Sequence, residues 1–372
     1  MVRGASLSRT FEDLLTPQAV DTILGESALR APFIRVIENG GDVPSARYTT
    51  AASAGNDRLT DVVDPEAVAR HWDRGATLVL NALHKTQPSI ARMSRDLGQE
   101  LGAHVQANAY ITPPGVKGLP AHYDTHDVIV LQIDGSKRWI IHRPVIDLPL
   151  PTQQGRDVTV STADEPLIDT VLHAGDALYL PRGFVHAPET RDERSIHLTF
   201  GIQVITWADM LRDLVGAVVA DDASLRRAAP LHATAGTGPL LREAAVRLAT
   251  LLNSLDQDTA EAGITKWRQR TTLSEPIPVL GRQDDAAALS ADTPLRPRAG
   301  LRWHTTTGEQ DVTVHTAHRK VRIPLALEAA LHQALTEPTT AAHLTSGHPT
   351  ATQDQIMALL RHLLGNGLLI RA

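Results

Sequence analysis

With 372 residues, the chain is long enough for two or three domains with substantial apolar cores. The absence of cysteine excludes a disulfide framework, a thiolate nucleophile and an iron–sulfur cluster, and a net charge of −6 offers no general footprint for nucleic acid. The first residues lack the apolar run of a signal peptide, and no stretch has the apolar length of a membrane span. We therefore expect a cytoplasmic protein that does not enter membranes.

The first hundred residues alternate between helical and extended patterns. Apolar residues at helical spacing predict helices over 9–30, 64–72 and 86–101. Short apolar runs at 33–37 and 77–80 predict strands between them.

From 104 to 205 the pattern indicates β-structure. The predicted strands cover 105–111, 128–133, 138–141, 177–180 and 195–204. Asp134-Gly135 separates two of them and predicts a hairpin turn. Many short strands with turns rich in proline and glycine favour a barrel or a sandwich.

After Thr206 the period changes to that of helices. One apolar stripe contains Met210, Leu211, Leu214, Val215, Val218 and Val219, and a second contains Leu240, Leu241, Ala244, Ala245, Leu248, Leu251 and Leu252. Two such stripes exceed what one barrel face needs, so we expect 207–255 to form a four-helix bundle with a second copy in a homodimer.

The last part of the chain begins with a polar stretch at 256–300, which we interpret as containing a linker. Beyond it the pattern predicts a strand at 312–314, helices at 324–336, 339–345 and 352–365, and a closing strand at 367–370. Three helices followed by a short strand resemble a winged helix.

The most informative motif is His122-Tyr123-Asp124, which a second histidine, His186, follows after a Pro-Arg-Gly turn. Alternate side chains of an extended segment share a face, so His122 and Asp124 would point the same way. Two imidazoles and one carboxylate on one face of an octahedron leave three positions open, as in non-haem Fe(II) oxygenases. We predict that His122, Asp124 and His186 bind one metal ion.

Polar residues in the neighbouring strands suggest a second ligand. Lys137 would pair with a carboxylate if it points into the barrel, but a register shift of one residue would put Arg138 there instead. Asn108 and Tyr110 share a face of the preceding strand, and such side chains need partners when they are buried.

Five segments together resemble the JmjC-type cupin hydroxylases, and within them the ribosomal oxygenase branch. These segments are 107–115, 118–124, 130–132, 135–139 and 178–186. Over about 105–200, both the residue types and their spacing agree with those of the family. The resemblance implies a double-stranded β-helix that binds Fe(II) and 2-oxoglutarate and uses O2.

The resemblance assigns roles to single residues of this chain. By position, His122, Asp124 and His186 correspond to the iron ligands, Lys137 to the residue that grips the C5 carboxylate of 2-oxoglutarate, and Asn108 and Tyr110 to polar residues of that pocket. Members of the branch often have a serine on the final strand where this chain has Gly201, with Thr199 as a possible substitute. His197 shares a face with Thr199, and its side chain either lines the pocket or is simply packed in the core.

The expected organisation follows from the resemblance. It comprises a mainly β catalytic domain with flanking helices (1–205), a helical dimerisation region (206–256), a linker (257–300) and a winged-helix-like domain (301–372). The implied activity is hydroxylation of an arginine or histidine side chain in a protein or peptide, foremost a ribosomal protein. A lysine at position 137 is more similar to the histidyl-hydroxylating members.

Three alternatives stay open. The first is a tailoring hydroxylase of a ribosomally made peptide natural product. The second is a winged-helix DNA-binding regulator, but the helix over 353–364 carries only Arg361 and His362 as cations, so nucleic acid is not an expected partner. The third is a cupin with another metal and no 2-oxoglutarate, against which Lys137 and Asn108 argue.

Overall fold

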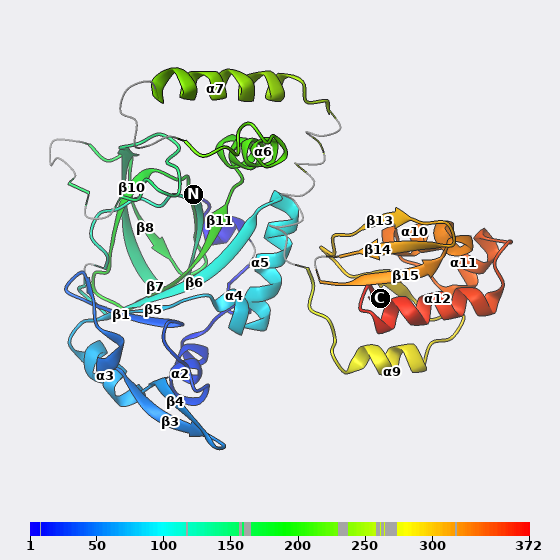
Figure 1. Cartoon of the computed structure of the whole chain (residues 1–372). Coiled ribbons are helices and arrows are strands. Elements are labelled where there is room, and N and C mark those ends of the chain that lie inside the picture. The colour runs from blue at the N-terminus through cyan, green and yellow to red at the C-terminus, as the bar shows by residue number, and fades with distance from the viewer. Residues whose placement is uncertain are drawn as a thin grey trace. The chain divides into compact units, whose positions relative to one another are not determined.

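The computed structural model describes residues 1–7, 9–116, 118–155, 158–159, 165–229, 237–257, 261, 264, 274–316 and 318–372. They divide into two compact units, Met1–Val204 and Ile205–Ala372, each of which is described by itself (Figure 1). Among the described residues, no helix has the length and apolarity that a membrane crossing requires.

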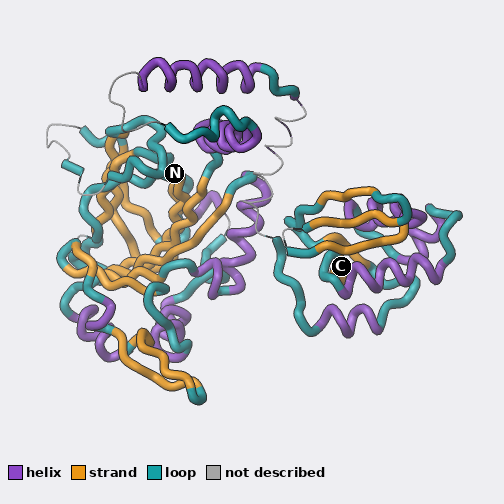
Figure 2. The backbone as a smooth tube through the Cα atoms, in the orientation of Figure 1, coloured by secondary structure: helices purple, strands orange, loops and turns teal. Residues whose placement is uncertain are grey.

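The first unit is built around a curved antiparallel sheet (Figure 2). The strands of this unit are β1 (Ile34–Glu38), β2 (Gly41–Asp42), β3 (Thr49–Ala54), β4 (Asp57–Val63), β5 (Thr77–Leu80), β6 (His104–Thr112), β7 (Asp127–Pro144), β8 (Ile168–His173), β9 (Ala177–Leu180), β10 (Phe184–Glu189) and β11 (Ser195–Gln203). The main path runs β10-β7-β11-β6-β5-β1-β2, with β8 and β9 also paired to β7, while β3 and β4 form a separate hairpin. The mainly β core with flanking helices is confirmed.

Helices flank this sheet: α1 (Gly4–Leu7), α2 (Pro17–Glu26), α3 (Pro65–Asp73), α4 (Leu83–Thr86), α5 (Pro88–Leu101), with a 3-10 turn η1 (Ser45–Arg47). The helix expected over 9–30 is shorter because Pro17 fixes its first position and the Thr16 hydroxyl accepts a hydrogen bond from the Ala19 amide. Asp64 caps α3 in the same way, before a proline at its first position.

The long strand β7 corrects the predicted hairpin at Asp134-Gly135. The chain does not turn back there, because β7 continues through it and Asp134 and Gly135 pair with Ile196 and Ser195 of β11. Gly135 adopts φ +63°, and a Cβ atom there would overlap the Arg194 carbonyl oxygen. The turn signal therefore marks a bulge in a bent strand, whose first half pairs with β9 and β11 and whose second half pairs with β8 and β10.

Two apolar clusters follow from this bend. The larger one lies between the sheet and the helices α2, α3 and α5 and includes Leu15, Ile90 and Phe200. The smaller one lies inside the barrel and contains Val128, Val130, Trp139, Ile141, Leu172, Leu178 and Leu180. The interior residues of β7 are even-numbered before the bulge and odd-numbered after it.

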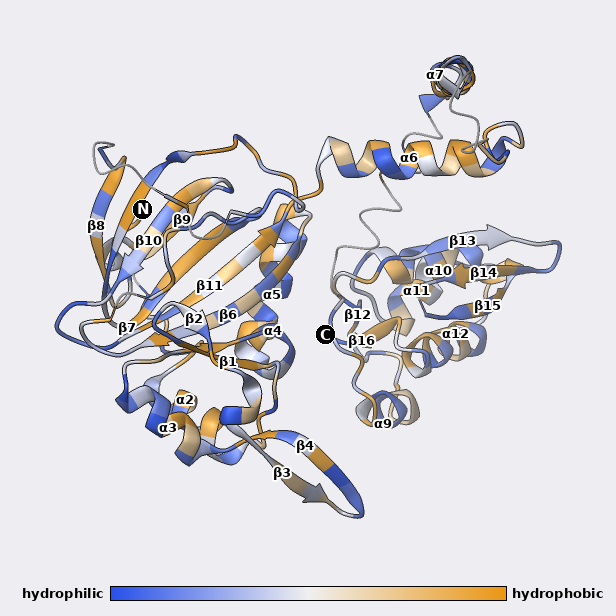
Figure 3. Cartoon of the chain, turned by 60° about the vertical axis from the view of Figure 1, so that its left-hand side comes forward, coloured by the Kyte–Doolittle hydropathy of each residue, from blue (hydrophilic) through white to orange (hydrophobic). Residues whose placement is uncertain are grey.

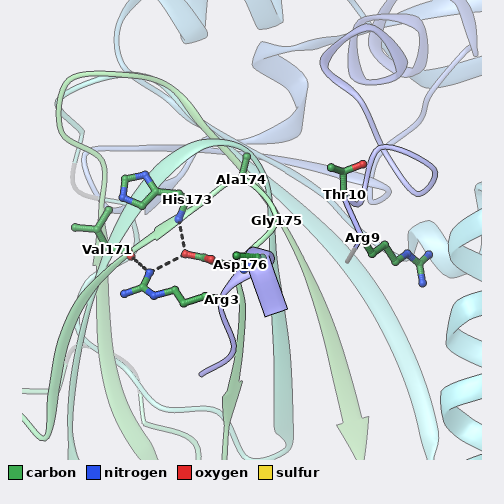
Figure 4. A pocket seen from close by; sticks show the side chains of 10 residues that line it. Arg3, Arg9, Thr10, Val171, His173, Ala174, Gly175 and Asp176 are labelled. Carbon is green, nitrogen blue, oxygen red and sulfur yellow. Dashed lines mark hydrogen bonds and ion pairs between the residues drawn. The ribbon is translucent and has the colours of Figure 1, made fainter. Parts of the chain in front are cut away.

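The N-terminal residues are fixed to the turn between β8 and β9. The buried Asp176 carboxylate accepts hydrogen bonds from the backbone amides of Gly4 (2.8 Å) and His173 (3.0 Å) and forms an ion pair with Arg3 (2.7 Å) (Figure 4). Burial raises the pKa of Asp176, but these amides and the guanidinium outweigh it, so its pKa lies below the ordinary value.

We expect Asp176→Ala to lower the free energy of unfolding by about 1–3 kcal/mol, because it removes the buried acceptor that Arg3 and the amides of Gly4 and His173 share. Since the folded-state pKa is depressed, this contribution is present above about pH 4 and is lost as the pH falls through the folded-state value. Urea denaturation of the wild-type and Asp176→Ala proteins at pH 7 and at lower pH measures this contribution to the free energy of unfolding. Asp13→Ala, which removes the exposed partner of Arg9, should change stability by less than about 0.5 kcal/mol. Equal effects of the two substitutions contradict the role given to Asp176.

In the second unit, α6 (Trp207–Asp221) and α7 (Thr237–Asn253) contact each other and carry the two predicted apolar stripes. A capping box between Thr206 and Asp209 starts α6. Neither helix has a buried residue, and Trp207 and Leu241 are 77% and 72% exposed. Figure 3 shows hydrophobic residues along both helices.

The remainder of this unit packs around its own apolar core, which includes Leu295, Leu331, Ile356 and Leu360. It contains α9 (Gly281–Ala287), β12 (Leu295–Pro297), β13 (His304–Thr307), β14 (Asp311–His315), β15 (Lys320–Pro324), η2 (Leu325–Leu327), α10 (Glu328–Thr336), α11 (Ala341–Gly347), α12 (Gln353–Gly365) and β16 (Leu369–Arg371).

Part of the range expected as a linker is folded. The helix α9 packs on α12, and β12 pairs with the closing strand β16, so the polar composition of 281–297 was misleading. Of the expected linker, 258–260, 262–263 and 265–273 lie outside the described residues. Strands β13 and β15 flank the predicted strand at 312–314 and were not predicted.

Candidate metal centre

Three predicted ligands lie together at one end of the barrel. Ligand atoms of His122, Asp124 and His186 all lie within 4.8 Å of one another, and His186 Nε2 is 3.8 Å from an Asp124 carboxylate oxygen. Among the described residues this is the single cluster of three or more such side chains that suits a metal ion. Tyr123 points elsewhere, since it is buried and its hydroxyl donates to the Gln153 carbonyl.

The backbone sets the positions of both imidazoles. The amide of His122 donates to the carbonyl of His186 (3.1 Å), and the amide of His186 donates to the carbonyl of His122 (2.8 Å). Each Nδ1 also lies within hydrogen-bond distance of a carbonyl, that of Pro120 for His122 (2.8 Å) and that of Phe184 for His186 (3.0 Å). When Nδ1 carries the proton, Nε2 is left with a free lone pair, which is the tautomer that a metal ligand requires.

His186 is also neutral at ordinary pH. Burial, helped by the neighbouring His122, lowers the pKa of His186 to about 4, although Asp124 acts in the opposite direction. A divalent cation therefore meets a neutral imidazole beside a carboxylate. Two nitrogens and one oxygen in this arrangement fit Fe(II) and similar ions.

Lys137 lies inside the barrel, beside the candidate metal ligands. It is 2% exposed, and it lines the same cavity as His122, Asp124 and His186. Its ammonium donates to the Thr112 hydroxyl (3.0 Å), and burial lowers the pKa of Lys137 to about 7. Within the described part of the chain no carboxylate pairs with it, so the cavity has a buried amine whose protonated, cationic form an anionic ligand would stabilise.

Arg138 lies on the other face of β7. It pairs with Asp169 (2.6 Å) and Glu189 (2.8 Å) outside the barrel. The bulge at Ile133, next to Asp134-Gly135, decides between the two cations, because unbroken alternation from Val128 and Val130 would have turned Arg138 inward.

Tyr110, His197 and Thr199 also line the cavity. The rings of Tyr110 and His197 are stacked, with centroids 5.0 Å apart and planes at 4°. Burial, and secondarily Asp124, raises the pKa of Tyr110 to about 12, so its phenol stays protonated. Burial and then Lys137 lower the pKa of His197 well below its usual value.

Asn108 has a different environment. Its side-chain oxygen accepts a hydrogen bond from the Ala82 amide (2.9 Å), and it is not among the residues that line the cavity. Its role at the cosubstrate stays a prediction.

Gly201, where the resemblance led us to expect a serine, lies against the imidazole of His126. A Cβ atom at Gly201 would lie 3.0 Å from the imidazole carbon Cε1 of His126. The imidazole of His126 therefore occupies the space that a side chain at 201 would need.

The sequence did not predict Thr77 and Trp139, which line the cavity, or Thr112, which holds Lys137. Thr77 donates to Thr112, the acceptor of Lys137, while Trp139 packs against His186 and His197. Trp139 lies two positions after Lys137 and Thr112 two after Tyr110, so strand periodicity alone places them on the same faces. The buried Trp139 Nε1 and His197 Nδ1 atoms have no hydrogen-bond partner among the described residues, which fits a cavity that receives a polar ligand.

Residues 78–210 match the family model of the JmjC domain, and this part of the chain is a JmjC domain. The chain is similar to "Ribosomal oxygenase 1" of Gallus gallus, with 34% identity over 158 residues, which are 42% of this chain and 26% of that protein. It is also similar to "Bifunctional lysine-specific demethylase and histidyl-hydroxylase NO66" of Drosophila pseudoobscura pseudoobscura, with 27% identity over 252 residues, 60% of this chain and 26% of that protein.

The chain spans only about a quarter of the length of these two relatives. Among solved structures, that of ycfD from E. coli aligns with a TM-score of 0.52 at 18% identity, over 96% of this chain and 91% of that one. This likeness concerns the fold.

Proposed function

We propose that the protein is an Fe(II)- and 2-oxoglutarate-dependent oxygenase that hydroxylates a side chain of a protein or peptide. The buried Lys137 carries the proposal. A cupin that uses only a metal needs no unpaired cation inside its barrel, whereas a dicarboxylate cosubstrate held at the metal brings a second carboxylate that needs one. The JmjC match and the relatives named as oxygenases support the same activity.

The residues present have defined roles in this proposal. His122, Asp124 and His186 would hold Fe(II), which when bound would supply the oxidising chemistry with 2-oxoglutarate and O2. Lys137, fixed by Thr112, would bind the remote carboxylate of 2-oxoglutarate and so orient it. The apolar side chains Val128, Val130 and Leu180 exclude water around the cosubstrate.

We further propose that the substrate is a ribosomal protein. The names of the relatives support this, and the lysine at 137, together with the name "histidyl-hydroxylase" of one relative, favours histidine over arginine as the modified residue. Mass spectrometry of ribosomal proteins from a strain without this gene tests the assignment. We expect loss of a mark of about +16 Da, one oxygen, from a protein that carries it in the parent strain. Loss of that mark from a secreted peptide, with unchanged ribosomal proteins, contradicts a ribosomal substrate and favours the tailoring hydroxylase.

We also propose that α6 and α7 form a homodimer, the role expected for 207–255. The lack of any buried residue on two helices with long apolar stripes supports it. We expect light scattering of dilute protein to give a dimer, and Leu214→Glu with Leu248→Glu to split or unfold it. Glu243→Lys, on the opposite side of α7 from the stripe, should leave the mass unchanged. A mass of about 40 kDa for the wild-type protein contradicts the bundle.

For the region 301–372, we propose a winged-helix-like module. The order of α10, α11 and α12 before β16 supports it, as does the three-stranded sheet β13-β14-β15.

A further inference from the structure

One face of the sheet β13-β14-β15 carries an unusual set of polar side chains. Val312, Val314, Val321 and Ile323 point into the core, so the intervening residues point outward. Cross-strand pairing aligns them in three rows: His304, His315 and Lys320 in the first, Thr306, Thr313 and Arg322 in the second, and Asp311 and Pro324 in the third. The first two rows contain no carboxylate, and Asp311 lies at the end of the face away from the stacked imidazoles.

An open depression of about 530 Å³ runs along the edge strand β15 of this sheet. Its basic lining consists of His315, Lys320, Arg322 and His362, and its neutral lining of Thr306, Thr313, Val321 and Asn366. None of the described residues that line it is acidic, and its volume lies in the range of about 300–1,000 Å³ that ligand sites occupy. The depression is therefore suited to an anion.

The side chains of the two cations in the depression, Lys320 and Arg322, are free to contact an anionic ligand. Lys320 and Arg322 are exposed, and neither forms an ion pair or a side-chain hydrogen bond in the described part of the chain. They lie two positions apart on one strand and so project in the same direction. Partial burial, His304 and Lys320 each lower the pKa of His315, which is consistent with a positive local potential.

Beside the cations lies a flat aromatic surface. The imidazoles of His304 and His315 are stacked, with centroids 4.7 Å apart and planes at 5°, and the Thr306 hydroxyl fixes His315 through a hydrogen bond of 2.8 Å to Nε2. His304 is exposed. The exposed imidazole of His304, stacked on the fixed imidazole of His315 and next to cations, provides both parts of a single-strand platform, a ring for bases to stack on and charges for the backbone.

We propose that this face, His304, His315, Lys320 and Arg322, binds single-stranded RNA. Charge complementarity selects a polyanion, and the stacked imidazoles select bases over acidic peptide side chains, which have no ring to stack. The Thr313 hydroxyl lies in the same row as Arg322, in reach of a ribose 2′-hydroxyl at this surface. The expectation against nucleic acid rested on the net charge of −6 and on the few cations of α12, whereas Lys320 and Arg322 lie on the strand β15.

Fluorescence anisotropy of the full chain with a labelled single-stranded RNA of about ten nucleotides tests the proposal. No metal or 2-oxoglutarate is needed, so the outcome is independent of the proposed oxygenase activity. We expect salt-sensitive binding, and we expect Lys320→Ala with Arg322→Ala to reduce the slope of log K against log salt by about 1.4, about 0.7 for each phosphate that the protein no longer neutralises. His304→Ala should weaken binding by about five- to a hundredfold, the value of one stacked base, while His304→Phe retains it.

Arg58→Ala is the matched control, because Arg58 is an exposed cation on the β3–β4 hairpin of the other unit. It should leave affinity and salt slope unchanged, and all variants should keep the circular dichroism of the wild type. The proposal is wrong if the RNA does not bind, if Arg58→Ala weakens binding as much as the double variant does, or if duplex RNA or single-stranded DNA binds more tightly. Displacement of the RNA by an equal concentration of polyglutamate would assign the surface to an acidic protein instead.

Discussion

Asp124→Ala is expected to abolish the conversion of 2-oxoglutarate into succinate. Asp124 contributes the single carboxylate of a cluster whose other two members are imidazoles, so its removal leaves only two imidazole ligands for a divalent cation. Changes to groups that only orient a ligand cost about 10–100-fold in metal affinity or activity, and removal of a direct ligand should exceed that. The measurement is succinate released per chain, together with iron bound per chain.

Asp169→Ala is the control for this experiment. It also removes a carboxylate from the barrel, but from the outer face, where Asp169 pairs with Arg138. We expect this variant to keep its iron and most of its activity. Full succinate formation by the Asp124→Ala protein overturns the assignment of the metal site.

Lys137→Ala is expected to weaken the binding of 2-oxoglutarate while iron ligation remains. A hydrogen bond to a charged group contributes about 1.5–3 kcal/mol, which corresponds to about ten- to a hundredfold in affinity. Calorimetric titration of 2-oxoglutarate into metal-loaded protein without O2 gives the constant directly.

Arg138→Ala is the matched variant, since it removes a cation from the next position but from the outer face of β7. We expect its affinity for 2-oxoglutarate to equal that of the wild type. Unchanged affinity in the Lys137→Ala protein, or a large decrease in Arg138→Ala, contradicts the proposed anchor.

Much of the metal centre was predictable because its geometry is local. The i, i+2 spacing of His122 and Asp124 requires only an extended segment, and the structure brings both to His186. The mutual backbone hydrogen bonds of His122 and His186 are a tertiary pairing between segments far apart in the chain. No periodicity predicts that contact; the resemblance to a family supplied it.

The choice between Lys137 and Arg138 shows where periodicity fails. Alternation continued across Asp134-Gly135 points Arg138 inward, and the bulge reverses the result. The same dipeptide appeared to be a hairpin turn, since a glycine at positive φ serves both structures. Only the pairing of β7 with β11 distinguishes the bulge from a hairpin turn.

The C-terminal unit illustrates a second limit. Strands β12, β13 and β15 are three to five residues long, and polar or charged side chains occupy their outward positions. They become strands through pairing with β14 and β16, which the sequence does not reveal locally.

The most direct test of the proposed activity is whether the purified wild-type protein, given Fe(II) and O2, converts 2-oxoglutarate into succinate and CO2. We predict turnover that a chelator stops and added Fe(II) restores, at about one bound iron per chain, the capacity of a single set of two imidazoles and one carboxylate. Protein that binds Fe(II) at this site and yet forms no succinate, with or without ribosomal proteins as substrate, contradicts the account.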